Sequence, residues 1–377
     1  MAGIYIHIPF CIQRCFYCDF YREIGSDSKK IDAFIQALIH EIELRKDDLN
    51  GESIQSVYFG GGTPSVLNYD QFRLIFDVLH QYFTICSNAE ITLEANPDDL
   101  TEAYLDSLSP LPINRLSIGI QTFNDKHLRE LNRRHNATQA YAAVANARKY
   151  GFKNISIDLI YALPGQDMID WEEQLDAALH LGVEHISTYG LTYEEGTALW
   201  HHRNEGKIQE TEDITAIAMF NHLRKKMKEN GYEAYEISNY AKPGFRSRHN
   251  SAYWKFIPYL GFGPSAHSFN GKTRQWNVSS VQQYIECIRN HQSFFEQEIL
   301  SKQDFYNDYV MVALRTSEGI DINYLHERFG QELPDYCIQS AAPHLAAGDL
   351  IMNGQYLSLS GTGIHIANII IMDLIKV

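Results

Sequence analysis

Short runs of β-branched and aromatic residues alternate with helix-like stretches through roughly the first 200 residues. The helix-like stretches cover residues 30–49, 69–83 and 138–151, and the strand-like runs cover residues 4–8, 56–59, 90–95, 115–120, 155–163 and 185–191. Strands that alternate with helices predict βα units and a parallel sheet of the α/β class. Because a closed barrel needs eight units, the pattern favours an open, partial (β/α)6 barrel, with a doubly wound sheet as the alternative.

The pattern changes near residue 232. Residues 232–269 are rich in aromatic side chains and predict irregular strands and loops around an apolar surface. Helical spacing returns from about residue 300, which predicts a small helical or winged-helix-like C-terminal domain. We therefore expect three parts: a partial-barrel core over residues 1–231, an aromatic-rich β extension over 232–295, and a C-terminal domain over 296–377.

A polar or glycine-rich feature follows each of the first five predicted strands. The first strand leads to a group of cysteines, and the second leads to the sequence GGGTP at residues 60–64. Glu94, Gln121 and Asp158 stand at the ends of the next three. Taken singly, such a residue is more often a helix cap or a loop anchor. The carboxyl ends of parallel strands converge on one mouth, however, so we expect these residues to form one site.

The cysteines occur as CIQRCFYC, which places Cys11, Cys15 and Cys18 at C-x3-C-x2-C spacing. Three thiolates at this spacing can bind three irons of a cubic iron–sulfur cluster and leave the fourth iron open to an amine and a carboxylate. Structural zinc with His7 as fourth ligand is the alternative, although zinc sites more often add a second, distant pair of ligands. The other cysteines are scattered and do not resemble a disulfide framework.

The three consecutive glycines of GGGTP allow the backbone to approach a ligand closely. A plain tight turn is the alternative, and a phosphate loop is disfavoured because no Gly-Lys-Ser/Thr follows. We expect a side chain at Gly62 to block the ligand and to leave the cysteine site intact.

Together these motifs resemble the radical S-adenosylmethionine superfamily, and within it the family of oxygen-independent coproporphyrinogen III oxidases and related heme chaperones. The likeness covers nearly the whole chain, including residues 5–10, IDLIYALPGQ at 157–166 and LRTSEGI at 314–320. It implies a [4Fe–4S] cluster on Cys11, Cys15 and Cys18, with S-adenosylmethionine completing the open iron.

The same resemblance implies a binding site for S-adenosylmethionine. Gly61, Gly62 and Thr63 would hold the methionine amino end and Glu94 the ribose. Aromatic and polar contacts beside the cluster and the ligand are implied for Tyr5, Tyr17, Gln121, Arg133, Asp158 and Thr192.

Two departures separate the chain from the oxidase branch. Phe20 stands where that branch carries a further cysteine, and only four residues precede Tyr5 in place of a long N-terminal extension. The sequence HNSAYW, with His249, Asn250, Tyr253 and Trp254, resembles the HNxxYW signature of the heme-chaperone branch instead. We therefore expect a heme chaperone, with coproporphyrinogen III dehydrogenation and radical methyl transfer as alternative activities.

Heme requires an axial donor and a large apolar surface, and histidine is its commonest protein donor. His249 is the first candidate for the iron ligand, with Asn250, Tyr253 and Trp254 beside the heme. Arg246 and Arg248 are close enough in sequence to meet the propionates. Alternatively, His249 stabilises a loop, His267 binds the iron, or a cysteine attaches the heme covalently.

Composition narrows the partners further. The 377 residues carry 47 acidic and 32 basic side chains, a net charge of -15, so binding of a long nucleic acid is not expected. The longest apolar run, residues 366–372, is too short to span a membrane, and the first residues show no secretory signal. We expect heme as cargo, heme-acceptor proteins that include respiratory membrane components as partners, and a cytoplasmic location with membrane contact only through those partners.

Overall fold

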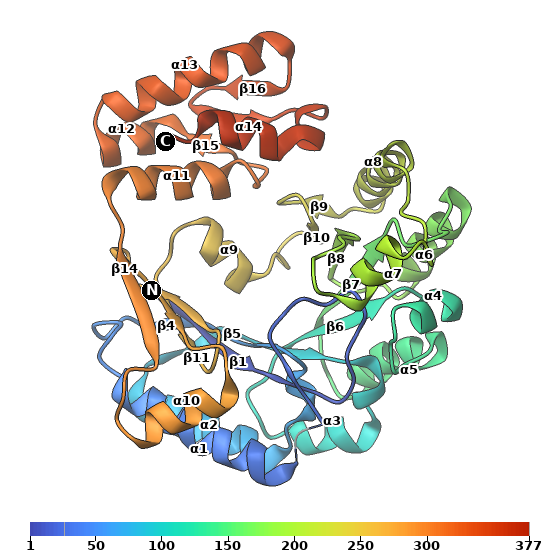
Figure 1. Ribbon diagram of the computed structural model, residues 1–377, viewed down its shortest axis with the longest axis vertical. Helices are drawn as coiled ribbons and strands as arrows, with labels where there is room; N and C mark the ends of the chain where they lie inside the picture. The colour runs from blue at the N-terminus through green and yellow to red at the C-terminus, as the bar shows by residue number, and fades with distance from the viewer. Residues whose placement is uncertain (26, 377) are drawn as a thin grey trace.

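Six parallel strands form the centre of the molecule, as a computed structural model that describes residues 1–25 and 27–376 shows. They are β1 (Ala2–Ile8), β4 (Ile54–Gly61), β5 (Ile85–Ala95), β6 (Arg115–Gln121), β7 (Asn154–Tyr161) and β8 (His185–Gly190). Each pairs with the next in chain order, without the reversal of strand order that defines a doubly wound sheet. The arrangement confirms the predicted open (β/α)6 barrel (Figure 1).

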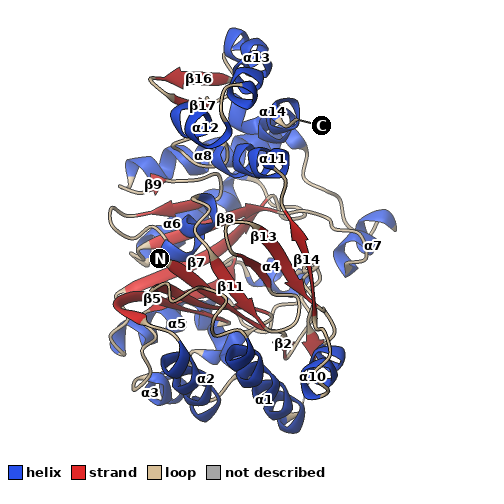
Figure 2. Cartoon of the chain, turned by 90° about the vertical axis from the view of Figure 1, so that its left-hand side faces the viewer, coloured by secondary structure: helices blue, strands red, loops and turns tan. Residues whose placement is uncertain are grey.

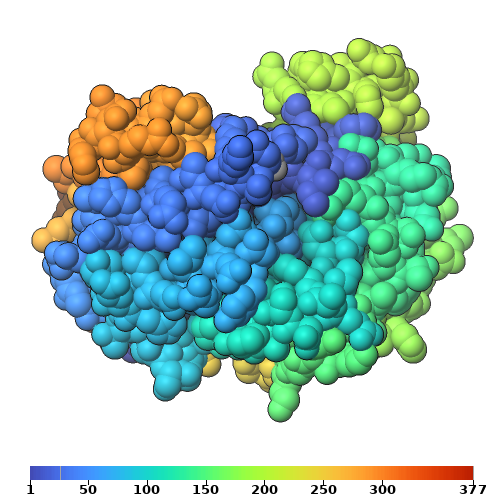
Figure 3. All heavy atoms as spheres, turned by 90° about the horizontal axis from the view of Figure 1, so that it is seen from below, coloured from blue at the N-terminus to red at the C-terminus, as the bar shows by residue number. Residues whose placement is uncertain are grey.

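Helices connect these strands and pack outside the barrel, and two further helices, the last of the list below, follow the sixth strand. They are α1 (Ser28–Leu44), α2 (Tyr69–Tyr82), α3 (Glu102–Leu108), α4 (Asp125–Glu130), α5 (Ala137–Lys149), α6 (Met168–His180), α7 (Ala198–Asn204) and α8 (Asp213–Glu229). Seen from below, the helices of the first half of the chain form a continuous outer surface (Figure 3). The short strands β2 (Phe10–Cys11) and β3 (Glu23–Ile24) pair beside the barrel mouth and brace the loop that holds the cysteines.

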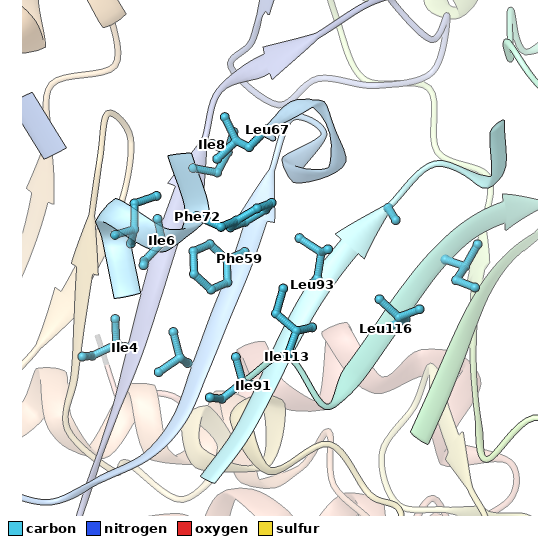
Figure 4. Packing of buried hydrophobic residues seen from close by; sticks show 14 of the residues in the cluster. Ile4, Ile6, Ile8, Phe59, Leu67, Phe72, Ile91, Leu93, Ile113 and Leu116 are labelled. Carbon is cyan, nitrogen blue, oxygen red and sulfur yellow. The ribbon is translucent and has the colours of Figure 1, made fainter. Parts of the chain in front are cut away.

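Every second residue of the strands fills the core between sheet and helices. In β1, Ile4, Ile6 and Ile8 are fully buried on one side, because side chains alternate along a strand. They pack with Phe59 of β4 and Phe72 of α2, whose rings meet edge to face 5.3 Å apart (Figure 4). Burying one such side chain stabilises the fold by about 1.5–3 kcal/mol. This layer therefore fixes the strand ends from which the site residues project.

The aromatic-rich extension continues the same sheet on both sides of the barrel strands. On one side, β11 (Tyr259–Phe262) pairs with β1 and is followed by β12 (His267–Phe269), β13 (Thr273–Asn277) and β14 (Phe295–Ile299). On the other, β10 (Asn239–Ala241) pairs with β8 and with β9 (Glu233–Ala234). Helix α10 (Val281–Arg289) packs beside α1, and α9 (Arg248–Trp254) lies over the sheet. The sequence pattern predicted strands and loops here but not α9, which lies between the barrel strands and the C-terminal helices in Figure 1. Figure 2 shows β11, β13 and β14 as strands of the extended sheet.

The C-terminal part has its own cluster of buried apolar residues. Helices α11 (Lys302–Ala313), α12 (Ile322–Phe329), α13 (Glu332–Ala347) and α14 (Ala367–Leu374) surround a small antiparallel sheet of β15 (Ile320–Asp321), β17 (Tyr356–Leu359) and β16 (Leu350–Asn353). This agrees with the expected helical, winged-helix-like domain. The division at residues 231 and 295 stays a prediction, since the extension shares its sheet with the core. Across the described residues, no helix combines the length and the apolar character that a membrane crossing requires.

Candidate functional site

A cavity of about 550 Å³ opens at the C-terminal ends of the barrel strands. It brings together nearly all of the residues that the sequence predicted for the cluster and its ligand. Those that line it are Cys11, Cys15, Tyr17, Cys18, Gly61, Gly62, Thr63, Glu94, Gln121, Arg133, Asp158 and Thr192. The convergence follows from the parallel sheet, which places every strand end at the same mouth.

Each of the three cysteine sulfurs accepts a hydrogen bond from a different side chain. Thr63 Oγ1 donates to Cys11 Sγ over 3.3 Å, and Arg133 Nη1 donates to Cys15 Sγ over 3.1 Å. Arg22 Nη1 donates to Cys18 Sγ, also over 3.1 Å. Hydrogen bonds to sulfur stabilise the thiolates that ligate iron and tune the potential of the cluster. Arg22 was not predicted, although its position four residues after Cys18 was a usable signal.

The arrangement fits a cluster better than a single zinc ion. Burial raises the pKa of the Cys11 and Cys18 thiols, so a metal must favour their thiolate forms at neutral pH. In the part of the chain that the structure describes, no three His, Cys, Asp or Glu side chains are grouped to hold one ion. His7, the alternative zinc ligand, lies at hydrogen-bond distance from the Tyr5 hydroxyl and lines a second cavity, not the one that holds the cysteines. The thiolates of a cubic cluster bind separate irons and need not converge on one point.

The glycine loop is held tightly against the chain that leads to the cysteines. Gly62 N–H donates to the Ile8 carbonyl and Thr63 N–H to the Phe10 carbonyl, each over 2.8 Å. A Cβ added at Gly62 would lie 2.8 Å from the Phe10 oxygen and 2.9 Å from the Ile8 oxygen. A side chain at Gly62 would therefore displace the segment that carries Cys11. The structure argues against the expectation that it would spare the cysteine site, because the close approach here is to backbone, and the effect on a bound cluster stays a prediction.

Two half-buried carboxyl groups, Glu94 and Asp158, stand on the side of the cavity formed by β5 and β7. Burial, with a smaller contribution from the nearby Asp158, raises the pKa of Glu94 to about 7. Burial likewise raises the pKa of Asp158 to about 6. Glu94 accepts hydrogen bonds from Tyr58 Oη at 2.7 Å and from Gly61 N–H at 3.2 Å. Because the carboxyl groups of Glu94 and Asp158 are largely shielded from water, they favour a ligand that brings its own hydrogen-bond donors, such as ribose hydroxyls or an amino group.

Arg133 contacts both the cysteine loop and the strand ends that line the cavity. Besides its bond to Cys15, it donates through Nη2 to the Gly119 carbonyl at 2.7 Å and to Asn96 Oδ1. Although burial alone lowers it, the pKa of Arg133 is raised by its neighbours Tyr17 and Cys15, so the guanidinium stays charged. Asn96 orients this group, and its place after the third strand was the available signal.

Gln121 and Thr192 complete the rim. Gln121 ends β6 with a left-handed φ of 68°, a conformation that non-glycine residues adopt rarely and that often marks a functional site. Thr192 is exposed after β8.

Among the residues predicted for the cluster and for S-adenosylmethionine, Tyr5 lies outside the first cavity. It projects from β1 into a second cavity of about 670 Å³, which lies beside the first. Its hydroxyl lies 3.0 Å from His7 Nδ1, and its ring stacks with those of Tyr58 and His249.

The residues of the HNxxYW sequence all lie on α9 but face different surroundings. His249 is 2% exposed, and its Nδ1 and Nε2 lie 2.9 Å from Ser56 Oγ and from Tyr253 Oη. Tyr253 lines the second cavity, whereas Trp254 lines a third of about 360 Å³. Asn250 is half-buried, and its backbone N–H donates to the Ser247 side chain that caps the helix.

The two arginines predicted to meet propionates have other partners. Arg246 forms ion pairs with Glu233 and Glu318 over 3.2 Å and 2.9 Å. Arg248 donates to the Asn88 carbonyl over 2.7 Å. The assignment of heme to His249 and its neighbours therefore stays a prediction.

Comparison with known proteins first defines the class. Residues 5–178 match the radical SAM superfamily, and residues 300–366 match the HemN C-terminal domain. The structure superposes on coproporphyrinogen III oxidase (HemN) from Escherichia coli, a radical SAM enzyme, with a TM-score of 0.87 over 100% of this chain and 90% of that one. At 23% identity, this likeness shows the fold.

Closer relatives then define the family. The heme chaperone HemW of Bacillus subtilis is 33% identical over 366 residues, which cover 96% of each chain. The heme chaperone HemW of Lactococcus lactis is 34% identical over 86% of this chain and 84% of its own. The chain belongs to the HemW family.

Proposed function

We propose that this protein is a heme chaperone, which binds heme and passes it to acceptor proteins. It carries a [4Fe–4S] cluster bound by Cys11, Cys15 and Cys18, with exchangeable S-adenosylmethionine at the open iron. The names of its relatives support the cargo, and the first cavity supports the cluster.

The observation that carries the cluster assignment is the set of sulfur contacts. Three cysteine sulfurs line one cavity, and each has its own donor from Thr63, Arg133 or Arg22. A merely structural group of thiols has no need for two guanidinium groups directed at sulfur. When bound, the cluster and its ligand supply one-electron chemistry.

Each residue opposite the cysteines is assigned a different part of S-adenosylmethionine. Glu94 and Asp158 accept hydrogen bonds from hydroxyl or amino groups, and Arg133 and Gln121 meet the carboxylate. Gly61 and its neighbours shape the wall against which the methionine part lies. Thr192 would contact the ligand at the exposed rim of the cavity, and Tyr17 would lie beside the cluster.

The alternative, oxidative decarboxylation of coproporphyrinogen III, lacks one group that the oxidase branch has. Phe20, which replaces that cysteine, is 67% exposed and lines both the first and the second cavity. An apolar side chain in this place favours the binding of a macrocycle over redox chemistry. The proposal places the protein in the reducing cytoplasm, in contact with membranes only through its partners.

The test is an anaerobic comparison of two reactions with the cluster-loaded protein. Heme-loaded protein should pass heme to respiratory membranes depleted of heme, which is measured as recovered cytochrome absorbance. Incubation with coproporphyrinogen III, S-adenosylmethionine and reductant should yield no protoporphyrinogen. Formation of protoporphyrinogen at enzyme-like rates would contradict the proposal and favour the oxidase.

A further inference from the structure

We propose that heme binds in the second cavity, with His267 as the ligand of its iron. This inference rests on the proposed function, and it assigns the iron to a different histidine from the one that the HNxxYW sequence suggests. It depends on the shape of the second cavity, on the surroundings of His267 and His249, and on the residues at the boundary with the first cavity.

The second cavity has the size and the walls that a porphyrin needs. Its volume of about 670 Å³ lies within the range of about 300–1,000 Å³ typical of small-molecule sites. Tyr253, Tyr259 and Phe269 of the extension form one wall, and Met311 of α11 belongs to another. The rings of Tyr253 and Tyr259 meet edge to face 4.6 Å apart, which gives this wall a fixed shape. Three distant stretches of chain thus enclose one largely apolar space, which suits a flat macrocycle.

His267 can reach a ligand in this cavity without rearrangement of the core. It stands at the start of β12, it lines the cavity and it is exposed. Its ring packs near that of Trp276, with centroids 6.4 Å apart, which limits its orientation. An imidazole that is exposed in the cavity can approach an iron there without breaking a core contact.

His249 lacks these properties. Both of its ring nitrogens lie at hydrogen-bond distance from a side chain, and the ring is stacked 4.9 Å from that of Tyr58. Iron ligation there would break one of these bonds and open the core. His249 is instead a positioning residue, because its Nε2 contacts the hydroxyl of Tyr253, which faces the cavity.

Arg274 lines the same cavity, where two carboxylates already neutralise its charge. Its Nε donates to Glu298 over 2.7 Å and its Nη1 to Asp308 over 3.1 Å. These two carboxylates fix the plane of the guanidinium, and Asp308 itself lines the cavity. As for Arg246, these ion pairs leave no uncompensated charge for a heme propionate, so heme binding here depends on the apolar walls and on His267.

Phe20 is the boundary between the cluster and the heme in this arrangement. Asp19 and Phe20 are the residues that line both cavities, and they directly follow Cys18. The aromatic ring at this position gives the macrocycle an apolar contact close to the cluster. Phe20, in place of a cysteine, would thus contribute apolar contact area to the bound heme.

The experiment is an anaerobic heme titration of the cluster-loaded full chain, followed by the Soret band. His267→Ala should bind heme at least about tenfold more weakly and with a shifted Soret band, and added imidazole should restore the band. His80→Ala is the matched control, because His80 is an exposed histidine on the outer helix α2. His249→Ala should keep the Soret position of the unmodified chain.

A second pair of variants tests the cavity without touching a histidine. Phe20→Asp should weaken heme binding, whereas Phe20→Leu should retain it; both changes are at an exposed side chain that the fold tolerates. Unchanged heme binding by His267→Ala, or loss of the Soret band only in His249→Ala, would overturn the inference and leave the proposed function standing. If the unmodified chain binds no heme, the proposed function fails and the inference fails with it.

Discussion

Replacing Glu94 by glutamine is expected to stabilise the protein without its cofactors at alkaline pH. Burial raises the pKa of this carboxyl from its ordinary 4.5 to about 7. The folded chain therefore holds a proton there that the unfolded chain has lost between these two values, and stability falls as the pH rises through that window. Full ionisation in the fold costs about 3 kcal/mol, since one pKa unit corresponds to about 1.4 kcal/mol. Glutamine keeps the hydrogen-bonding shape and carries no charge, so the variant should escape this cost.

The assay is urea unfolding of the reduced, cofactor-free chain at about pH 5.5 and at about pH 8. The unmodified chain should lose about 2 kcal/mol more than Glu94→Gln between these two conditions. Glu173→Gln, on the exposed face of α6, should follow the unmodified chain. The same Glu94 variant should bind S-adenosylmethionine more weakly, because a carboxylate is the stronger acceptor for ribose hydroxyls. An equal pH dependence in Glu94→Gln and the unmodified chain would refute the reasoning.

Two further substitutions test the fold around the site. Gly62→Ala should cost about 1–3 kcal/mol of stability and should reduce cluster content, because its Cβ meets the backbone before Cys11. Gly361→Ala is the control, because its Cβ has open space, and it should change neither stability nor cluster content. An intact cluster in Gly62→Ala would contradict the packing described for Gly62. His249→Ala should cost about 3 kcal/mol in urea unfolding, because it opens a cavity and leaves Ser56 and Tyr253 without their partner. A loss no greater than that of His80→Ala would show that His249 does not stabilise the core.

The sequence predicted the barrel and the first cavity because both depend on local patterns. Alternating strand and helix signals determine the sheet, and a parallel sheet necessarily collects its strand ends at one mouth. Glu94, Gln121 and Asp158 could therefore be assigned to one site before any contact was known. The spacing of the cysteines likewise predicted a metal site, and the cavity does bring the three side chains together.

Features that depend on contacts between distant segments could not be predicted. Tyr5 alternates with the buried isoleucines of β1 and so faces away from the helices, but only the position of β11 determines which cavity it meets. Likewise, the second cavity exists because α11 packs over the extension, and no local pattern shows this. The contacts of Gly62 with the backbone of Ile8 and Phe10 were also invisible in the sequence, so it did not show that a side chain there would disturb the cysteine segment.

The most direct test of the account is one absorption spectrum of the anaerobically purified chain, taken before and after heme is added. We predict a broad iron–sulfur absorbance that is lost when Cys11, Cys15 and Cys18 are replaced by alanine and retained when Cys86, Cys287 and Cys337 are replaced. Added heme should then produce a Soret band shifted from that of free heme. An iron–sulfur spectrum that survives in the triple alanine variant, stoichiometric zinc in place of iron, or an unshifted heme spectrum would contradict the account.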